Sequence, residues 1–149
     1  MHKHILISTD GSKVAQKGVD QGVSLAKALG AKITIITVTE RFPVYAEGLT
    51  VGYAMSEPLM AEYAGGQKEA AKAILSAAKQ SAEQVGLSPD TVHVENAQPA
   101  EAIIQAAKSR DCDLIVMASH GRRGLGRLVL GSVTSEVLAH SPVPVLVVR

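Results

Sequence analysis

The chain has 149 residues and a formal net charge of +1, and 46% of its residues are hydrophobic while only 3% are aromatic. This length and composition suit one domain, residues 1–149, with an aliphatic core and exclude a disordered chain, and the near-neutral charge argues against a dedicated nucleic-acid-binding protein. No apolar run approaches the roughly 18 residues of a membrane-spanning helix, so we expect a cytoplasmic protein that is not inserted in a membrane.

The first part of the chain predicts a strand, a helix and a second strand. Residues 4–9, HILIST, form a short apolar run that ends at the turn signal Asp10-Gly11. Residues 32–38, KITIITV, are rich in β-branched side chains and predict a strand. Between them, small and apolar residues recur at spacings of three and four, which indicates one face of a helix over residues 12–29; they are Ala15, Gly18, Val19, Gly22, Leu25, Ala26 and Leu29.

The middle of the chain breaks this pattern and then returns to it. Residues 40–57 contain Pro43 and two glycines, and we expect a mobile connection that becomes ordered when a ligand binds. An alanine-rich helix is predicted from Leu59 to Val85. The residues expected to face inward are Ala70, Ala73, Ile74, Ala77 and Val85.

The second half predicts three further strands and two helices. A strand over residues 91–96 precedes Pro99, which suits the first position of a helix. Residues 112–118, CDLIVMA, are apolar almost throughout, which is typical of a central strand buried on both faces; the thiol of Cys112 is therefore expected to be inert. A helix over residues 132–140 and a last strand, from Val143 to Val148, follow. The expected inward face of the first of these helices is Ala102, Ile103, Ala106 and Ala107.

Strands that alternate with helices predict an α/β fold: one open five-stranded parallel sheet with helices on both faces, of the Rossmann-like kind. Ligands of such sheets lie at the carboxyl ends of the strands, where the strand order reverses. If the first and fourth strands are neighbours, the loops that follow them line one crevice. These loops are residues 8–12, STDGS, and residues 118–134, ASHGRRGLGRLVLGSVT.

The second of these loops matches neither common phosphate-binding motif. It has no Gly-Lys pair, and Val129 stands where the dinucleotide motif needs its third glycine. Gly121 nevertheless allows a tight turn, and Gly131-Ser132 precedes a helix whose free amides favour an anion; the Ser132 and Thr134 hydroxyls can add donors. From these residues alone two interpretations stay open: an anion site, or a solvated loop in which Ser132 is an ordinary N-cap.

Over its whole length the chain resembles the universal stress protein family of the UspA type, through ILISTDGS, LIVMASHGRRGLGRLVLGSVTSEVL and SPVPVLVV. The nucleotide-binding branch of that family carries Gly, two residues, Gly, nine residues and Gly-Ser/Thr. This chain has Gly121 and Gly131-Ser132 at that spacing, but Ala118 replaces the first glycine. Alanine is tolerated there if the backbone is extended and strained if φ is positive.

The resemblance implies an adenine nucleotide alpha hydrolase-like fold that binds ATP, with Mg²⁺ or Mn²⁺ as a companion ion. It places Thr9 and Asp10 against ribose and phosphates, with Asp10 toward the cation, and Val38 against the adenine. A second interpretation makes Asp10 the cap of the first helix. The full set of implied binding residues is Ser8, Thr9, Asp10, Val38, Ala118, Ser119, His120, Gly121, Arg122, Gly131, Ser132, Val133 and Thr134.

The function expected from the resemblance is an ATP-binding regulatory or stress-response module whose conformation or protein partner depends on the nucleotide. No residue is assigned a catalytic role, because His120 has no carboxylate partner that the sequence identifies. Two alternatives stay open: a dimeric stress-response module that binds no nucleotide, and a slow ATP hydrolase that uses Asp10 and a metal. We also expect a homodimer through the apolar strand from Val143 to Val148, because that strand can lie at a sheet edge with few defences against pairing.

Overall fold

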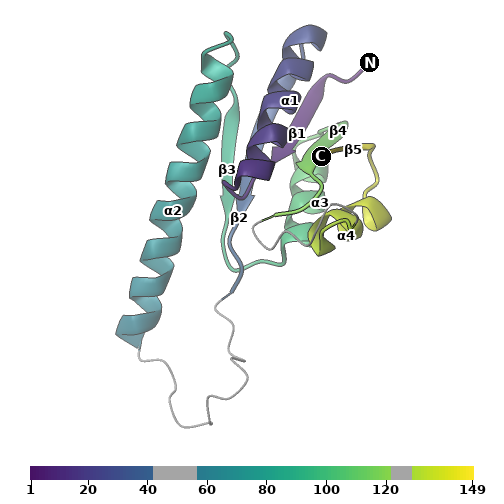
Figure 1. Cartoon of the computed structure of the whole chain (residues 1–149). Coiled ribbons are helices and arrows are strands. Elements are labelled where there is room, and N and C mark those ends of the chain that lie inside the picture. The colour runs from purple at the N-terminus through teal and green to yellow at the C-terminus, as the bar shows by residue number, and fades with distance from the viewer. Residues whose placement is uncertain (42–56, 122–128) are drawn as a thin grey trace.

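The computed structural model describes residues 1–41, 57–121 and 129–149 and contains five strands and four helices in alternation (Figure 1). The expected connection over residues 40–57 lies almost entirely outside the described residues, as does Arg122. The elements are β1 (His4–Ser8), α1 (Lys13–Leu29), β2 (Lys32–Val38), α2 (Glu57–Glu83), β3 (Asp90–Val94), α3 (Pro99–Ser109), β4 (Leu114–Ala118), α4 (Ser132–His140) and β5 (Val145–Val148).

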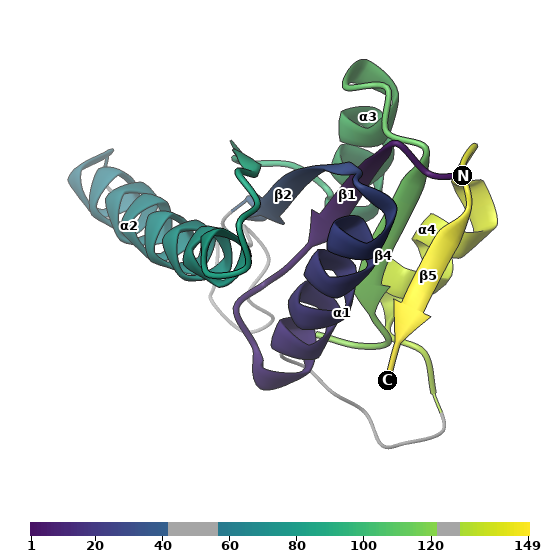
Figure 2. The same ribbon diagram turned by 90° about the horizontal axis from the view of Figure 1, so that it is seen from above.

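All five strands are parallel, in the order β3-β2-β1-β4-β5. The chain therefore builds the sheet outward from β1 in one direction and then returns to add β4 and β5 on the other side. Helices α1 and α2 cover one face, where Val19 and Leu75 belong to the same buried cluster as Ile5 and Ile7. Helices α3 and α4 cover the other face (Figure 2), where Ile103 and Val137 pack in the same cluster as strand residues. The predicted α/β fold is confirmed, and no helix within the described ranges is long and apolar enough to cross a membrane.

Two strands begin later than predicted because the residues before them have other backbone roles. The Cys112 amide donates to the Ala107 carbonyl at 2.9 Å and closes the end of α3, so β4 begins later, at Leu114. Strand β5 begins at Val145, after Pro144, whose carbonyl accepts the Ile115 amide at 3.0 Å. Pro99 does open α3, as predicted, with Gln98 as its N-cap.

The predicted inward face of α2 is wrong by one position. Ala70, Ala73, Ala77 and Val85 are exposed, and Ile74 is only partly buried. Alanines lie all round this helix, so the spacing of apolar residues does not distinguish one stripe from the next. The side chains buried against β2 and β3 are instead Ala71, Leu75, Ala78 and Ala82.

Glycines let α1 lie close to the two central strands. A Cβ atom built on Gly22 would lie 2.6 Å from Cδ1 of Ile7, a side chain with no exposed surface. A Cβ on Gly18 would lie 3.2 Å from the backbone nitrogen of Ala118, at the end of β4. The path of α1 therefore helps to fix the position at which the chain leaves β4.

Replacing Gly22 by alanine tests this close packing. Alanine improves helix propensity by about 0.5–1 kcal/mol, but overpacking a full core costs about 1–3 kcal/mol, so we expect Gly22→Ala to lower the free energy of unfolding. The matched control is Gly66→Ala on α2, where nothing lies within 4 Å of the added carbon and only the propensity gain remains. Urea unfolding followed by circular dichroism measures both, and equal stabilisation by the two variants would show that α1 is not tightly packed.

Candidate functional site

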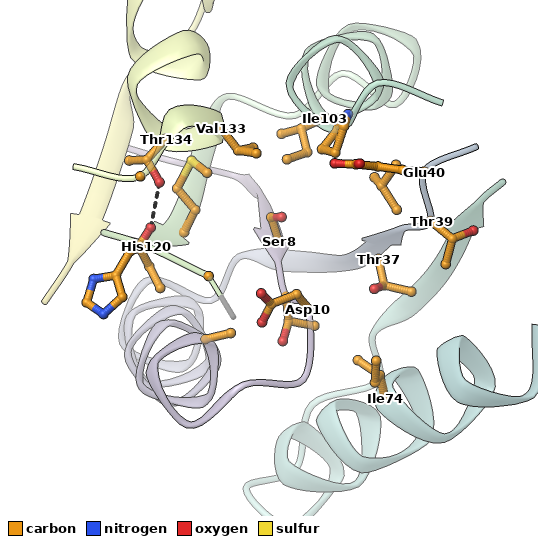
Figure 3. A pocket seen from close by; sticks show the side chains of 18 of the residues that line it. Ser8, Asp10, Thr37, Thr39, Glu40, Ile74, Ile103, His120, Val133 and Thr134 are labelled. Carbon is orange, nitrogen blue, oxygen red and sulfur yellow. Dashed lines mark hydrogen bonds between the residues drawn. The ribbon is translucent and has the colours of Figure 1, made fainter. Parts of the chain in front are cut away.

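A cavity of about 650 Å³ opens at the carboxyl ends of β1, β2 and β4. Its walls come from all sides of the sheet end: α2 on one side, α3 and the start of α4 on the other (Figure 3). It lies where the strand order reverses between β1 and β4, the place at which open α/β sheets bind ligands. The two loops that the sequence singled out therefore meet at one cavity.

Most of the residues expected to bind a ligand line this cavity. Ser119 does not; its side chain is buried, with 5% of its surface exposed. Arg122 lies outside the described residues. The expected residues that do line the cavity are Ser8, Thr9, Asp10, Val38, Ala118, His120, Gly121, Gly131, Ser132, Val133 and Thr134.

Side chains hold the turn between β1 and α1 in place. One carboxylate oxygen of Asp10 accepts the Ser12 amide at 2.9 Å, and the Thr9 hydroxyl accepts the Gly11 amide at 3.2 Å. The N-cap of α1 is Ser12, whose hydroxyl accepts the Ala15 amide at 3.1 Å. The interpretation of Asp10 as the helix cap is therefore wrong: Asp10 stabilises the turn that precedes the cap.

Gly121 is the point at which the loop after β4 meets this turn. A Cβ atom built on Gly121 would lie 2.5 Å from Oδ2 of Asp10. Any side chain at residue 121 would thus displace the Asp10 carboxylate from the cavity wall. Glycine at residue 121 therefore lets the loop after β4 lie directly against the Asp10 carboxylate of the loop after β1.

The two ends of the loop after β4 are joined through their backbone. The Gly131 amide donates to the Ser119 carbonyl at 2.7 Å, and the Thr134 hydroxyl donates to the Ala118 carbonyl at 2.9 Å. A Cβ on Gly131 would lie 3.0 Å from the Cα of His120, so a side chain there would meet the loop backbone. The Thr134 hydroxyl, which the sequence predicted as a donor to a ligand, donates to this buried carbonyl in the structure.

The start of α4 presents backbone donors to the cavity. Gly131 is its N-cap and makes no side-chain capping bond, so the interpretation of Ser132 as an N-cap is wrong. The first bond of the helix runs from the Ser135 amide to the Gly131 carbonyl at 2.9 Å. The amides of Ser132 and Val133 consequently have no acceptor within the helix, and together with the helix dipole they favour an anion.

Ala118 occupies its place without strain. It is the last residue of β4, where it is paired in register with Val148 of β5, so its backbone is extended. An extended residue accommodates a methyl group freely. The replacement of the family's first glycine by alanine is therefore compatible with the conformation of the loop.

At the end of β2, the backbone N–H and C=O of Val38 point toward the β1 side of the sheet. Successive residues of a strand form their backbone bonds on opposite sides. Ile36 accepts the Thr9 amide at 3.0 Å on the β1 side, and Thr39 donates to Val94 at 2.9 Å on the β3 side. Val38 lies two residues after Ile36, so its N–H and C=O face the β1 side, beyond Ser8, where that strand has ended.

Sequence reasoning missed the wall that comes from α2, and at the end of β2 it named only Val38. The α2 residues Tyr63, Gln67, Ala70 and Ile74 follow a helical spacing, and this periodicity was visible in the sequence; the Gln67 amide donates to the Tyr63 hydroxyl at 2.6 Å. That these four residues line the cavity depends on where α2 crosses the sheet, which the sequence does not show. The other missed residues of these walls and of α3 are Thr37, Thr39, Glu40, Arg41, Pro99 and Ile103.

Cys112 and His120 are the two side chains considered for chemistry. Cys112 lies outside the cavity, and His120 has a hydrogen-bond partner. Burial raises the pKa of the Cys112 thiol to about 11, and Cys112 lies outside the cavity; the expected inert thiol fits this position. The Nδ1 atom of His120 lies 3.0 Å from the Ser119 hydroxyl. Among the described residues no three His, Cys, Asp or Glu side chains come together as metal ligands.

Known proteins are similar to this chain in both sequence and fold. The universal stress protein family matches residues 1–149. The universal stress protein YxiE of Bacillus subtilis is 34% identical over 149 residues, which cover 100% of both chains. The solved structure of UspA from Lactobacillus plantarum has a TM-score of 0.82 at 26% identity, covering 99% of this chain and 97% of that one.

Two more distant structures share the fold and were solved as complexes. A universal stress protein in complex with cAMP has a TM-score of 0.69 at 24% identity, and it covers 99% of this chain and 97% of that one. One from Archaeoglobus fulgidus in complex with dAMP has a TM-score of 0.64 at 17% identity, covering 99% and 98%. The full-length sequence match and the strand order that reverses between β1 and β4 agree, and the chain belongs to the universal stress protein family.

Proposed function

We propose that this protein binds ATP in the cavity at the ends of β1, β2 and β4 and acts as a nucleotide-dependent regulatory module. The observation that carries the proposal is that one cavity combines free helix-end amides at one end with a free strand-end peptide at the other. The first suits phosphates and the second suits a base. Family members of the same fold in complex with cAMP and dAMP support an adenine nucleotide as the ligand class.

The phosphate end is formed by the start of α4 and the loop that precedes it. The amides of Ser132 and Val133 are positioned as donors, and a phosphate bound there would gain from the dipole of a nine-residue helix. Gly131 lies against the His120 backbone and Gly121 against the Asp10 carboxylate, where a Cβ atom would be too close. Binding would thus depend mainly on the backbone.

The base end is formed by Val38. Its N–H and C=O lie side by side on the free side of β2, a donor next to an acceptor. Adenine presents the complementary pair, the N1 acceptor and the N6 amino donor. Ile103 and Pro99 of α3 supply apolar surface for the face of the base.

Asp10 fits a cation that accompanies the phosphates. Its carboxylate lines the cavity next to Gly121, and an ionised carboxylate beside a triphosphate would repel it unless a cation lay between them. Mg²⁺ and Mn²⁺ prefer such oxygen ligands and commonly take one or two carboxylates together with substrate phosphates. With no cluster of protein ligands among the described residues, most of the coordination would come from the nucleotide and water.

The contact between α2 and the β1–α1 turn supports a regulatory role. A Cβ on Gly11 would lie 2.7 Å from Cγ1 of Ile74, so α2 rests directly on the turn that holds Asp10. Movement of this turn on nucleotide binding would therefore be transmitted to α2. The exposed first half of α2, which projects beyond the sheet (Figure 1), would present the change to a partner protein.

We further propose that the protein forms a homodimer through β5. This strand lies at the edge of the sheet and pairs only with β4 among the described strands. The Pro144 and Val148 carbonyls accept amides of β4 and of the loop after it, so the intervening Val145 and Val147 direct their backbone groups outward. Antiparallel pairing with the same strand of a second copy would satisfy these groups about a two-fold axis.

A variant at Gly131 tests the nucleotide site. The side chain of Gly131→Val would meet the His120 backbone and separate the loop ends, so we expect ATP affinity to fall by about tenfold or more, the equivalent of one or two lost charged hydrogen bonds. Ser132→Ala is the control, because it removes a hydroxyl but keeps the amide, and its affinity should change little. Isothermal titration gives both values, and equal affinity of wild type and Gly131→Val would refute the assigned site.

A charge-neutral variant of Asp10 tests the cation. Asp10→Asn keeps an oxygen to accept the Ser12 amide but removes the charge. We expect Mg²⁺ to strengthen ATP binding to the wild type by about tenfold and to affect the variant much less, so that in EDTA the variant binds more tightly than the wild type. Asp20→Asn, on the exposed side of α1, controls for net charge. A wild-type affinity that does not change on chelation would rule out the metal role.

Proline substitution at the outward-facing Val147 tests the dimer. Val147→Pro removes an N–H that faces away from β4, so the sheet should survive while pairing with a second copy is lost. Val147→Thr keeps the N–H and the branched shape and should remain dimeric. Light scattering at micromolar concentration distinguishes the two forms. A monomeric wild type, or a Val147→Pro variant that stays dimeric, would contradict the proposal.

A further inference from the structure

Glu40 is an acidic side chain that lines the base end of the cavity. It lines the cavity together with Val38 and Ile103, and Figure 3 shows its carboxylate reaching toward Ile103. None of the hydrogen bonds and ion pairs among the described residues involves this carboxylate. By contrast, its neighbour Arg41 donates to the Asn96 carbonyl at 3.2 Å. Glu40 therefore has acceptor capacity directed at the space where a base would lie.

The direction of β2 determines which edge of a base Glu40 would meet. Along a strand the C=O of a residue follows its N–H, so the Val38 carbonyl lies on the Glu40 side of the Val38 amide. An adenine bound to this pair puts N1 on the amide and N6 on the carbonyl. One N6 hydrogen then binds the carbonyl, and the second is directed toward the segment that continues to Glu40.

We propose that Glu40 is a specificity-determining residue that selects purines with a 6-amino group over 6-oxopurines. Its carboxylate accepts the second N6 hydrogen of adenine and repels the O6 atom that hypoxanthine and guanine place there. A hydrogen bond to a charged acceptor is stronger than a neutral one, and an acceptor that faces O6 without a proton between them is penalised. The inference rests on the proposed binding of ATP in this cavity.

The test compares ATP with inosine triphosphate, which differs from ATP only in replacing the 6-amino group by oxygen, with N1 protonated. We expect the wild type to prefer ATP, and Glu40→Gln to reduce that preference by about three- to tenfold. The glutamine amide can turn to donate to O6, so inosine triphosphate should gain affinity. Glu40→Ala removes both the acceptor for N6 and the charge that repels O6 but offers no donor, so it should weaken ATP binding and improve the binding of inosine triphosphate less than Glu40→Gln does.

Glu101→Gln is the matched control for charge. Glu101 lines a neighbouring groove with Glu40 and Arg41 but not the nucleotide cavity, so removing its charge should leave the preference unchanged. Titration calorimetry with both nucleotides on all four proteins gives the ratios. If the wild type binds ATP and Glu40→Gln leaves or increases the preference, the inference is overturned while the proposed function stands. If the wild type binds neither nucleotide, the proposed function fails and the inference fails with it.

Discussion

The arrangement of this protein depends on the reversal of strand order between β1 and β4. Both strands are central and parallel and end at the same side of the sheet, but the chain continues from them toward opposite edges, so the segments that follow diverge and leave a cavity between them. The close seating of α1, which Gly18 and Gly22 allow, keeps the two strands and their exits in a fixed relation. The remaining walls, from α2, α3 and α4, are built around that gap.

Within the gap, backbone groups carry most of the recognition that we propose. The start of α4 offers amides with no partner inside the helix, and the end of β2 offers the Val38 peptide beyond the last residue of β1. Such groups are fixed by the fold, so they cost little ordering entropy when a ligand binds. Side chains then adjust the site, with Asp10 near the phosphates and Glu40 near the base.

The same backbone bonds connect the site to the edge of the sheet. Ser119 accepts the Gly131 amide through its carbonyl and donates its own amide to Val148 of β5, each bond measuring 2.7 Å. The loop proposed to hold phosphates and the strand proposed to join two subunits therefore share one residue. On the opposite wall, Ile74 rests on the turn that contains Asp10, so α2 is linked to the same site.

The sequence by itself determined the order and type of the elements, since apolar runs and helical spacings are local properties. It also identified both loops that line the cavity, because each has a local signature: the turn signal Asp10-Gly11 in the first, and the glycines and helix start at residues 121, 131 and 132 in the second. Which stripe of α2 is buried was decided only by the position of that helix over β2 and β3, because its alanines look alike in sequence. The buried role of Ser119, the bond from Thr134 to Ala118 and the free side of Val38 also depended on the tertiary structure. Each of them is set by contact or register between segments far apart in the chain, which no local pattern encodes.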